Sequence, residues 1–174
     1  MDAAAHYRYL ASLGQDEFLA SAAPAALVRF RERQAGPEGG DRTLTLDEPG
    51  EETVDETMPH GRVTLGELVE MAIYPLAKKP GASFPDRITI GRTANNDIVV
   101  EDHSVSRLHA YVKAQGNGWV VADGGSKNGS WLRGEVLEAR RERPITSRMV
   151  LRLGDVDLTF YLAADLYAVL GGAT

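Results

Sequence analysis

The stretch "VEDHSVSRLHAYV", residues 100–112, joins a polar loop to the start of an apolar run. From Leu108 to Val112 apolar residues roughly alternate with others, and this pattern predicts a β-strand. Ser106 and His109 stand at the mouth of that strand, three residues apart. A serine and a histidine this close can be a hydrolase nucleophile and its base, or they can hold a loop in shape.

The catalytic interpretation fits the surrounding residues poorly. Side chains three apart on one strand point to opposite faces, so the pair can meet only if Ser106 lies in the loop before the strand. A nucleophile also needs a base that a third group orients, together with oxyanion donors. No G-x-S-x-G elbow surrounds Ser106, and the nearest later acid, Asp123, lies in a turn-like cluster. We therefore predict no catalytic residue here, and a local hydrogen bond between loop and strand.

Short apolar runs at close spacing, separated by turn residues, continue from about residue 63 to the end of the chain. The runs are "EMAIYPLAK", "RITIG", "DIVVE", "LHAYVKA", "GWVVAD", "GSWLRG", "MVLRLG" and "VDLTFYL". Glycine and Asn-Gly predict hairpin turns at "AQGNG" (114–118) and "SKNGS" (126–130). Seven or eight short strands at this spacing predict an all-β sandwich or barrel. The closing "AADLYAVLG" predicts a short helix at one end.

The first third of the chain has a different residue pattern, with candidate helix caps, which predicts helices. Asp2 is a candidate N-cap for "AAAHYRYLASL", which Gly14 would end, and Asp16 is a candidate N-cap for "EFLASAA". The segment "PAALVRFRERQ" (24–34) is compatible with either a helix or a strand.

An acidic segment follows at Glu38–Pro59, where eight acidic residues accompany a single Arg. Because it is also rich in Gly, Pro and Thr and poor in large apolar residues, we interpret it as a linker. The division expected is a mostly helical extension (1–37), an acidic flexible linker (38–61) and a β-sandwich domain (62–174).

Charge and composition exclude several classes of protein. The whole net charge of −6 falls within the first 80 residues, and a chain without a basic balance is an unusual nucleic-acid binder. The absence of Cys excludes disulfides and thiolate metal sites, and the four His residues lack metal-site spacing. No signal sequence or membrane-length apolar stretch is visible. We expect a soluble, cytoplasmic protein with no metal, cofactor, nucleic-acid or membrane partner.

Three short motifs at the ends of predicted strands contain the candidate binding residues of the β-rich part. They are "IGR" with Gly91 and Arg92, "SVSRLH" with Ser106, Arg107 and His109, and "SKNGS" with Lys127, Asn128 and Gly129. Loops cluster at the two ends of a sandwich, so these three can converge on one site. Arginine, lysine, serine and asparagine donors suit a phosphate dianion, whose oxygens only accept hydrogen bonds. No Gly-rich loop precedes a helix, which excludes a P-loop nucleotide site.

The ordered set "ITIGR…NNDIVVEDHSVSRLHAYV…WVVADGGSKNGSWLRG" resembles the forkhead-associated (FHA) domain of bacterial proteins, over roughly residues 72–161. The resemblance implies a β-sandwich of about eleven strands that binds phosphothreonine peptides through the loops at one end. It implies that Arg92 and Ser106 contact the phosphate, that Arg107 and Lys127 assist, and that Asn128 holds the peptide main chain. Gly91, His109 and Gly129 are implied as supports, with His109 bracing the loop that presents Ser106.

The leading hypothesis for the function is a non-enzymatic phosphothreonine-binding adaptor in a Ser/Thr protein kinase pathway. A second hypothesis is a switch in which the acidic segment supplies an internal ligand. Thr53, in "GEETVDETMP", is its preferred phosphorylation site and Thr57 is the second choice. A third is a scaffold that uses the sandwich without phosphate.

Overall fold

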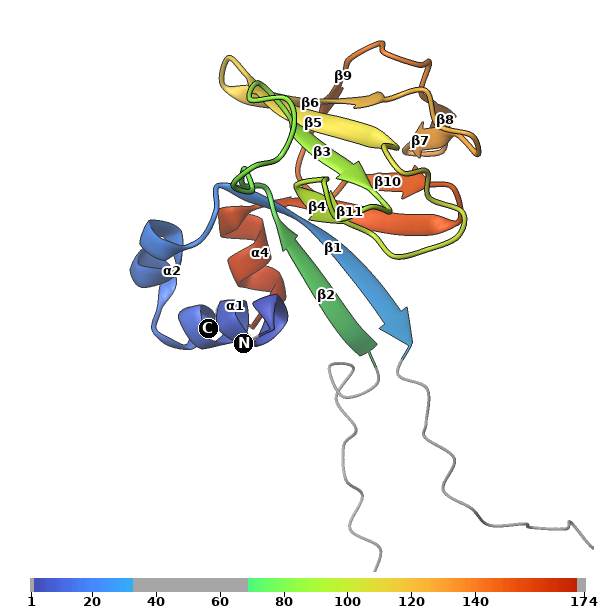
Figure 1. Ribbon diagram of the computed structural model, residues 1–174. Helices are drawn as coiled ribbons and strands as arrows, with labels where there is room; N and C mark the ends of the chain where they lie inside the picture. The colour runs from blue at the N-terminus through green and yellow to red at the C-terminus, as the bar shows by residue number, and fades with distance from the viewer. Residues whose placement is uncertain (1, 33–68, 172–174) are drawn as a thin grey trace, which may run out of the picture. The chain divides into compact units, whose positions relative to one another are not determined.

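The computed structural model describes residues 2–32 and 69–171, which form two β-sheets and three short helices (Figure 1). The six-stranded sheet has the order β2 (Val69–Pro75), β1 (Ala25–Glu32), β11 (Val156–Leu162), β10 (Val150–Leu153), β7 (Ser130–Leu132) and β8 (Glu135–Val136). The five-stranded sheet has the order β4 (Ile98–Val99), β3 (Ile88–Gly91), β5 (Ala110–Gln115), β6 (Gly118–Asp123) and β9 (Arg143–Ile145). The helices are α1 (Ala3–Ser12), α2 (Gln15–Ser21) and α4 (Ala163–Val169). The expected all-β sandwich with N-terminal helices and a C-terminal helix is confirmed.

The main core lies between the two sheets. Strand β10 shows how the sequence pattern produces it, because Leu151 and Leu153 are fully buried while Val150 and Arg152 alternate with them and are exposed. Such an alternation fixes the register, since a slip by one residue would turn the apolar face to solvent. Side chains from both sheets fill this core, among them Leu27, Ile90, Val112, Val121 and Phe160.

A second apolar cluster packs the three helices against the outer face of β1 and β11. Tyr7 of α1, Phe18 of α2 and Leu166 of α4 are buried in it, and they meet Ala26 and Val28 of β1. Among the described residues, no helix is long and apolar enough to span a membrane.

The segment 24–34 was compatible with a helix or a strand, and its described part forms strand β1 (Ala25–Glu32), which pairs antiparallel with β11. Ala25 and Leu27 face the main core, whereas Ala26 and Val28 face the helices. A strand buried on both faces shows no alternation, and this is why its apolar run could equally be a helix. The sandwich thus takes one strand from within the proposed N-terminal extension. The proposed boundaries at 37/38 and 61/62 lie outside the described residues.

The helix starts differ in detail from the prediction. Asp2 occupies the N-cap position of α1, but its side chain makes no capping hydrogen bond. The prediction that Asp16 caps the second helix is wrong, because Gly14 occupies the N-cap position of α2 and Asp16 lies in its first turn. A carboxylate in the first turn still interacts favourably with the helix dipole. Asp16 therefore does mark the start of α2, but it lies two residues after the N-cap position.

The two predicted hairpins have different outcomes. "AQGNG" joins β5 and β6 as a hairpin, with Gln115 opposite Gly118 and Gly116 at a positive φ of 58°. The prediction of a hairpin at "SKNGS" is wrong, because β6 and β7 belong to different sheets. The segment crosses from one sheet to the other, and side-chain hydrogen bonds to the carboxylate of Asp123 give it its shape.

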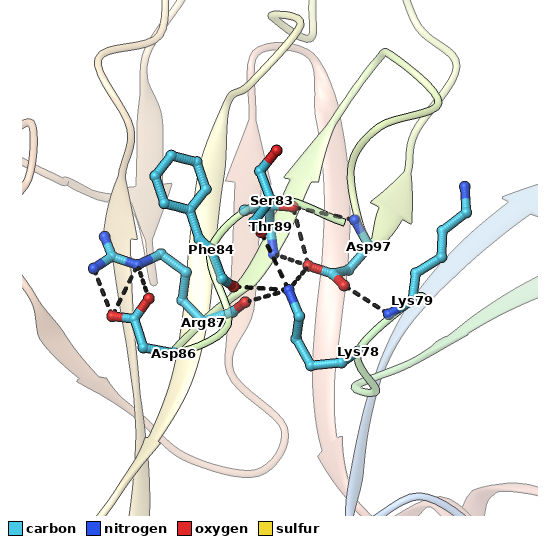
Figure 2. Close-up of polar contacts among 8 residues, drawn as sticks. All are labelled: Lys78, Lys79, Ser83, Phe84, Asp86, Arg87, Thr89 and Asp97. Atoms are coloured by element: carbon cyan, nitrogen blue, oxygen red, sulfur yellow. Dashed lines mark hydrogen bonds and ion pairs between the residues drawn. The ribbon is translucent and has the colours of Figure 1, made fainter. Parts of the chain in front are cut away.

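The connection between β2 and β3 is fixed by a single ammonium group (Figure 2). Lys78 Nζ donates to Asp97 Oδ2 at 2.7 Å and to the main-chain carbonyls of Ser83, Phe84 and Arg87.

The side chain of Asp97 is fully buried and also accepts hydrogen bonds from Lys79 N, Thr89 N and Thr89 Oγ1. Burial alone would raise the pKa of the Asp97 carboxyl, but the hydrogen bonds from Lys78, Thr89 and Lys79 outweigh it and lower the pKa. Because Asp97 ends the β3–β4 loop, the network ties the β2–β3 connection to that loop.

We expect Lys78→Met to lower the free energy of unfolding by about 1–3 kcal/mol, because the buried Asp97 carboxylate loses its cationic partner. Lys79→Met is the matched control, since Lys79 reaches Asp97 through its main-chain N–H and its Nζ bonds only the carbonyl of Ala94. Its effect should stay within about 0.5 kcal/mol. Urea unfolding of both variants measures the difference, and equal stabilities would contradict this role of Lys78.

Candidate functional site

The loops that carry the three predicted motifs converge, and main-chain groups join the first two. Arg92 N donates to Ser106 O at 2.9 Å, and Asn96 Nδ2 donates to Arg107 O at 2.6 Å. Thr93 Oγ1 also donates to Arg107 O, at 3.0 Å. A Cβ at position 91 would overlap the Arg107 carbonyl, so only glycine allows this approach of the two loops.

His109 joins the second loop to the third. Its ring is fully buried; Nδ1 accepts a hydrogen bond from Ser106 N at 2.9 Å, and Nε2 lies 2.9 Å from Gly129 O. Nδ1 can accept only when it is unprotonated, so Nε2 carries the hydrogen and donates it to Gly129. Burial lowers the pKa of His109 below its ordinary 6.5, against the opposing effects of the Gly129 carbonyl and the Asp123 charge.

The carboxylate of Asp123 shapes the β6–β7 loop from inside. Oδ2 accepts from Gly125 N and Ser126 N at 2.8 and 3.0 Å, and Oδ1 accepts from the hydroxyls of Ser126 and Ser130. Burial alone would raise the pKa of Asp123, but the hydrogen bonds from Ser126, Ser130 and Gly125 outweigh it and lower the pKa. The buried acid therefore stays ionised and holds the loop that presents Lys127 and Asn128.

Four hydrogen-bond donors lie on these loops, three on exposed side chains and one on the half-buried Ser106. Arg92 is exposed, and its Nε donates to Val105 O at 3.0 Å, which orients the guanidinium. The Ser106 hydroxyl oxygen accepts from Lys127 N at 3.0 Å, so its own proton can be donated outward. Arg107 and Lys127 are exposed, and neither they nor Arg92 form an ion pair with any residue that the structure describes.

Asn128 lies at the edge of this group. Its Nδ2 donates to Ser104 O at 2.8 Å, which orients the amide and leaves Oδ1 as an exposed acceptor. A groove of about 710 Å³ begins at Asn128 and continues along the outer face of β7 and β10, with Trp131, Arg152 and Asp155 in its lining. The groove offers space for an extended chain next to Asn128.

The geometry argues against nucleophilic catalysis by Ser106. Both ring nitrogens of His109 are engaged by main-chain groups, so neither can take the proton of the Ser106 hydroxyl. The sequence predicted a hydrogen bond between Ser106 and His109, and the bond found uses the main-chain N–H of Ser106. Within residues 2–32 and 69–171, no group of three or more acidic or His side chains could hold a metal ion.

The predicted residues are thus brought together, with two exceptions. Gly91, Arg92, Ser106, Arg107, His109, Lys127, Asn128 and Gly129 all belong to the three joined loops. Thr53 and Thr57 lie outside the described residues.

Sequence reasoning missed the residues that shape the loops from inside, chiefly Thr93, Asn96, Asp123 and Ser126. The run "DGGS" held a usable signal, because an Asp followed by Gly-Gly-Ser is typical of a turn that the Asp side chain closes.

Comparison with known proteins places this site in a family. Residues 88–154 match the family model of the FHA domain. An FHA domain-containing protein of Arabidopsis thaliana is 30% identical over 78 residues, which are 44% of this chain and 19% of that protein. The residues that match the FHA domain include all three loops of the site, as the sequence resemblance predicted.

Solved structures of FHA proteins are also similar. EmbR of Mycobacterium tuberculosis, in complex with a low-affinity phosphopeptide, is 29% identical with a TM-score of 0.45, over 53% of this chain and 22% of that one. The FHA domain of CT664 from Chlamydia trachomatis is 19% identical with a TM-score of 0.46, over 79% and 96% of the two chains. The chain spans about a fifth of the length of the Arabidopsis protein and of the EmbR chain.

We expect the free energy of unfolding to fall as the pH is lowered from about 7 to about 5. The folded state binds a proton at His109 less readily than the unfolded chain, because the pKa of His109 is lowered. The neutral ring makes its full contribution to the free energy of unfolding above about pH 6.5, the pKa of an unfolded His. This contribution is lost as the pH falls toward the lowered pKa of His109 in the folded state.

His109→Gln should be less stable at pH 7 and should lose most of this dependence, whereas the exposed His103→Gln should keep it. Urea unfolding at several pH values measures both slopes. The same slope in His109→Gln and the wild type would show that His109 does not carry the effect.

Proposed function

We propose that this chain is a phosphothreonine-binding module that acts in protein–protein interactions and has no catalytic activity of its own. The observation that carries the proposal is the pairing of Arg92 with Ser106. One main-chain hydrogen bond of 2.9 Å fixes their loops together, and each side chain keeps outward-facing donors. A phosphate group, whose oxygens only accept, matches such a set of donors.

The neighbouring residues extend this proposal to a phosphorylated peptide. Arg107 and Lys127 add two further cations, which suit a dianion better than a singly charged carboxylate. Asn128 is oriented by Ser104 and is exposed beside the groove, where it can bond the main chain of a peptide. The FHA family match supports the proposal, since FHA domains are phosphopeptide-recognition modules.

The cellular setting belongs to the proposal as well. We assign the module to a Ser/Thr kinase pathway in the cytoplasm of a bacterium, with a phosphothreonine-containing protein as its partner. The alternative of an internal ligand rests on the acidic context of Thr53 and Thr57, since a phosphate on either would compete for the same donors. A phosphate-independent scaffold is the other alternative.

Calorimetry with phosphothreonine peptides from a degenerate library tests the proposal. Arg92→Ala should weaken binding about 10- to 100-fold, because a hydrogen bond to a charged group contributes roughly 1.5–3 kcal/mol. Arg8→Ala is the matched control, since Arg8 is exposed, belongs to α1 and is part of neither the three loops nor the lining of the groove. The control should bind like the wild type.

Two results would count against the proposal. Failure of every phosphothreonine peptide to bind more tightly than millimolar would refute it. Equal binding of phosphorylated and unphosphorylated peptides would favour the phosphate-independent scaffold.

A further inference from the structure

A second, apolar pocket borders the loops of the phosphate site. It has a volume of about 290 Å³, and its apolar lining comes from Phe84, Leu108 and Tyr111. Arg87 and Arg140 flank it, and Gly124 forms part of its wall. Its volume is at the small end of the range for small-molecule sites, roughly 300–1,000 Å³, so it suits one large side chain better than an extended ligand.

Two apolar side chains that line this pocket are exposed. Phe84 is 48% exposed and Leu108 is 39% exposed. Phe84 also has a positive φ of 63°, which is uncommon for a bulky residue, and Arg140 has a φ of 61°. They are two of the four non-glycine residues with positive φ in the described part of the chain. Such strain persists only where the surrounding structure holds it, and it often marks a binding surface.

The network around Lys78 holds Phe84 in this position (Figure 2). Lys78 Nζ bonds the main-chain carbonyl of Phe84 at 2.8 Å, as well as those of Ser83 and Arg87. Figure 2 shows the Phe84 ring standing clear of the polar contacts that fix its main chain. Hydrogen bonds therefore hold the main chain of the turn, while the Phe84 ring stays about half exposed.

Arg87 holds a further part of the pocket lining, and its guanidinium lies 5.6 Å from the centroid of the Phe84 ring. The Arg87 guanidinium stacks over the Tyr111 ring, 4.5 Å from its centroid, and its Nη2 pairs with Asp86 at 2.7 Å. The pocket is thus formed before any ligand binds, which reduces the entropy cost of binding.

The sequence positions tie this pocket to the phosphate site. Leu108 lies between Arg107 and His109 in the β4–β5 loop, and Gly124 begins the β6–β7 loop that presents Lys127. The pocket and the phosphate site therefore share the β4–β5 and β6–β7 loops, so one flank of a polypeptide held at the phosphate site lies within reach of the pocket.

We propose that this pocket takes one large apolar side chain of the same phosphothreonine protein, next to an acidic residue that pairs with Arg140. The inference rests on the proposed function. Charge complementarity identifies the acidic neighbour, because Arg140 forms no ion pair with a described residue, whereas Arg87 already pairs with Asp86. An apolar side chain covers Phe84 and Leu108, which solvent otherwise wets.

A peptide library with a fixed phosphothreonine and randomised flanking residues tests the proposal. The immobilised full chain captures peptides from the library, and the captured peptides are sequenced. Phe84→Asn removes the ring and tolerates the positive φ, so its thermal stability should not fall. Leu108→Ser removes the other exposed apolar side chain of the lining. Leu19→Ser is the matched control, because Leu19 of α2 is 43% exposed and does not line the pocket.

The wild type and Leu19→Ser should enrich Leu, Ile, Met or Phe at one flanking position beside Asp or Glu. Phe84→Asn and Leu108→Ser should lose that enrichment and still require the phosphate. A selected peptide should bind the wild type about tenfold more tightly than its version with Ser at the apolar position.

Two outcomes would overturn this inference and leave the proposed function standing. In the first, the wild type captures phosphorylated peptides without any apolar preference. In the second, Phe84→Asn and Leu108→Ser both keep the apolar preference of the wild type. Capture that does not depend on the phosphate would overturn the proposed function together with this inference.

Discussion

The site depends on one neutral imidazole buried between two loops. His109 accepts from the main chain of Ser106 and donates to the main chain of Gly129, so it links two loops that belong to different strand connections. Only an uncharged ring with its hydrogen on Nε2 can make both bonds, because a protonated ring has no acceptor. Burial favours that state by disfavouring the charged one. The position of the Ser106 hydroxyl follows from this arrangement.

The other parts of the site divide the work between buried and exposed groups. Buried carboxylates shape the loops from within, Asp97 at the end of the β3–β4 loop and Asp123 at the start of the β6–β7 loop. Exposed cations project outward from the loops so formed, and water solvates them until a ligand arrives. Because the loop shape is set by internal hydrogen bonds, binding an anion needs little rearrangement.

The sequence was informative where one face of a strand is buried or where a motif has a fixed chemistry. Alternation predicted β5, β6, β10 and β11, and the ordered motifs predicted which loops meet. Strand β1 was left ambiguous because both of its faces are buried. "SKNGS" was misread as a hairpin because Asn-Gly reports a local turn, while the sheet to which the chain returns depends on distant pairing, β7 with β10. The role of Lys78 depends on contacts with Asp97 and three main-chain carbonyls, which no local pattern encodes.

The protonation of the His109 ring at neutral pH tests this account most directly. A long-range ¹H–¹⁵N correlation spectrum of the full chain distinguishes the two tautomers and the charged ring. The account predicts one His109 signal set with an unprotonated Nδ1 and a protonated Nε2, unchanged when a phosphothreonine peptide is added. A ring protonated at Nδ1, or one charged at neutral pH, would contradict the claim that His109 braces the site by these two hydrogen bonds.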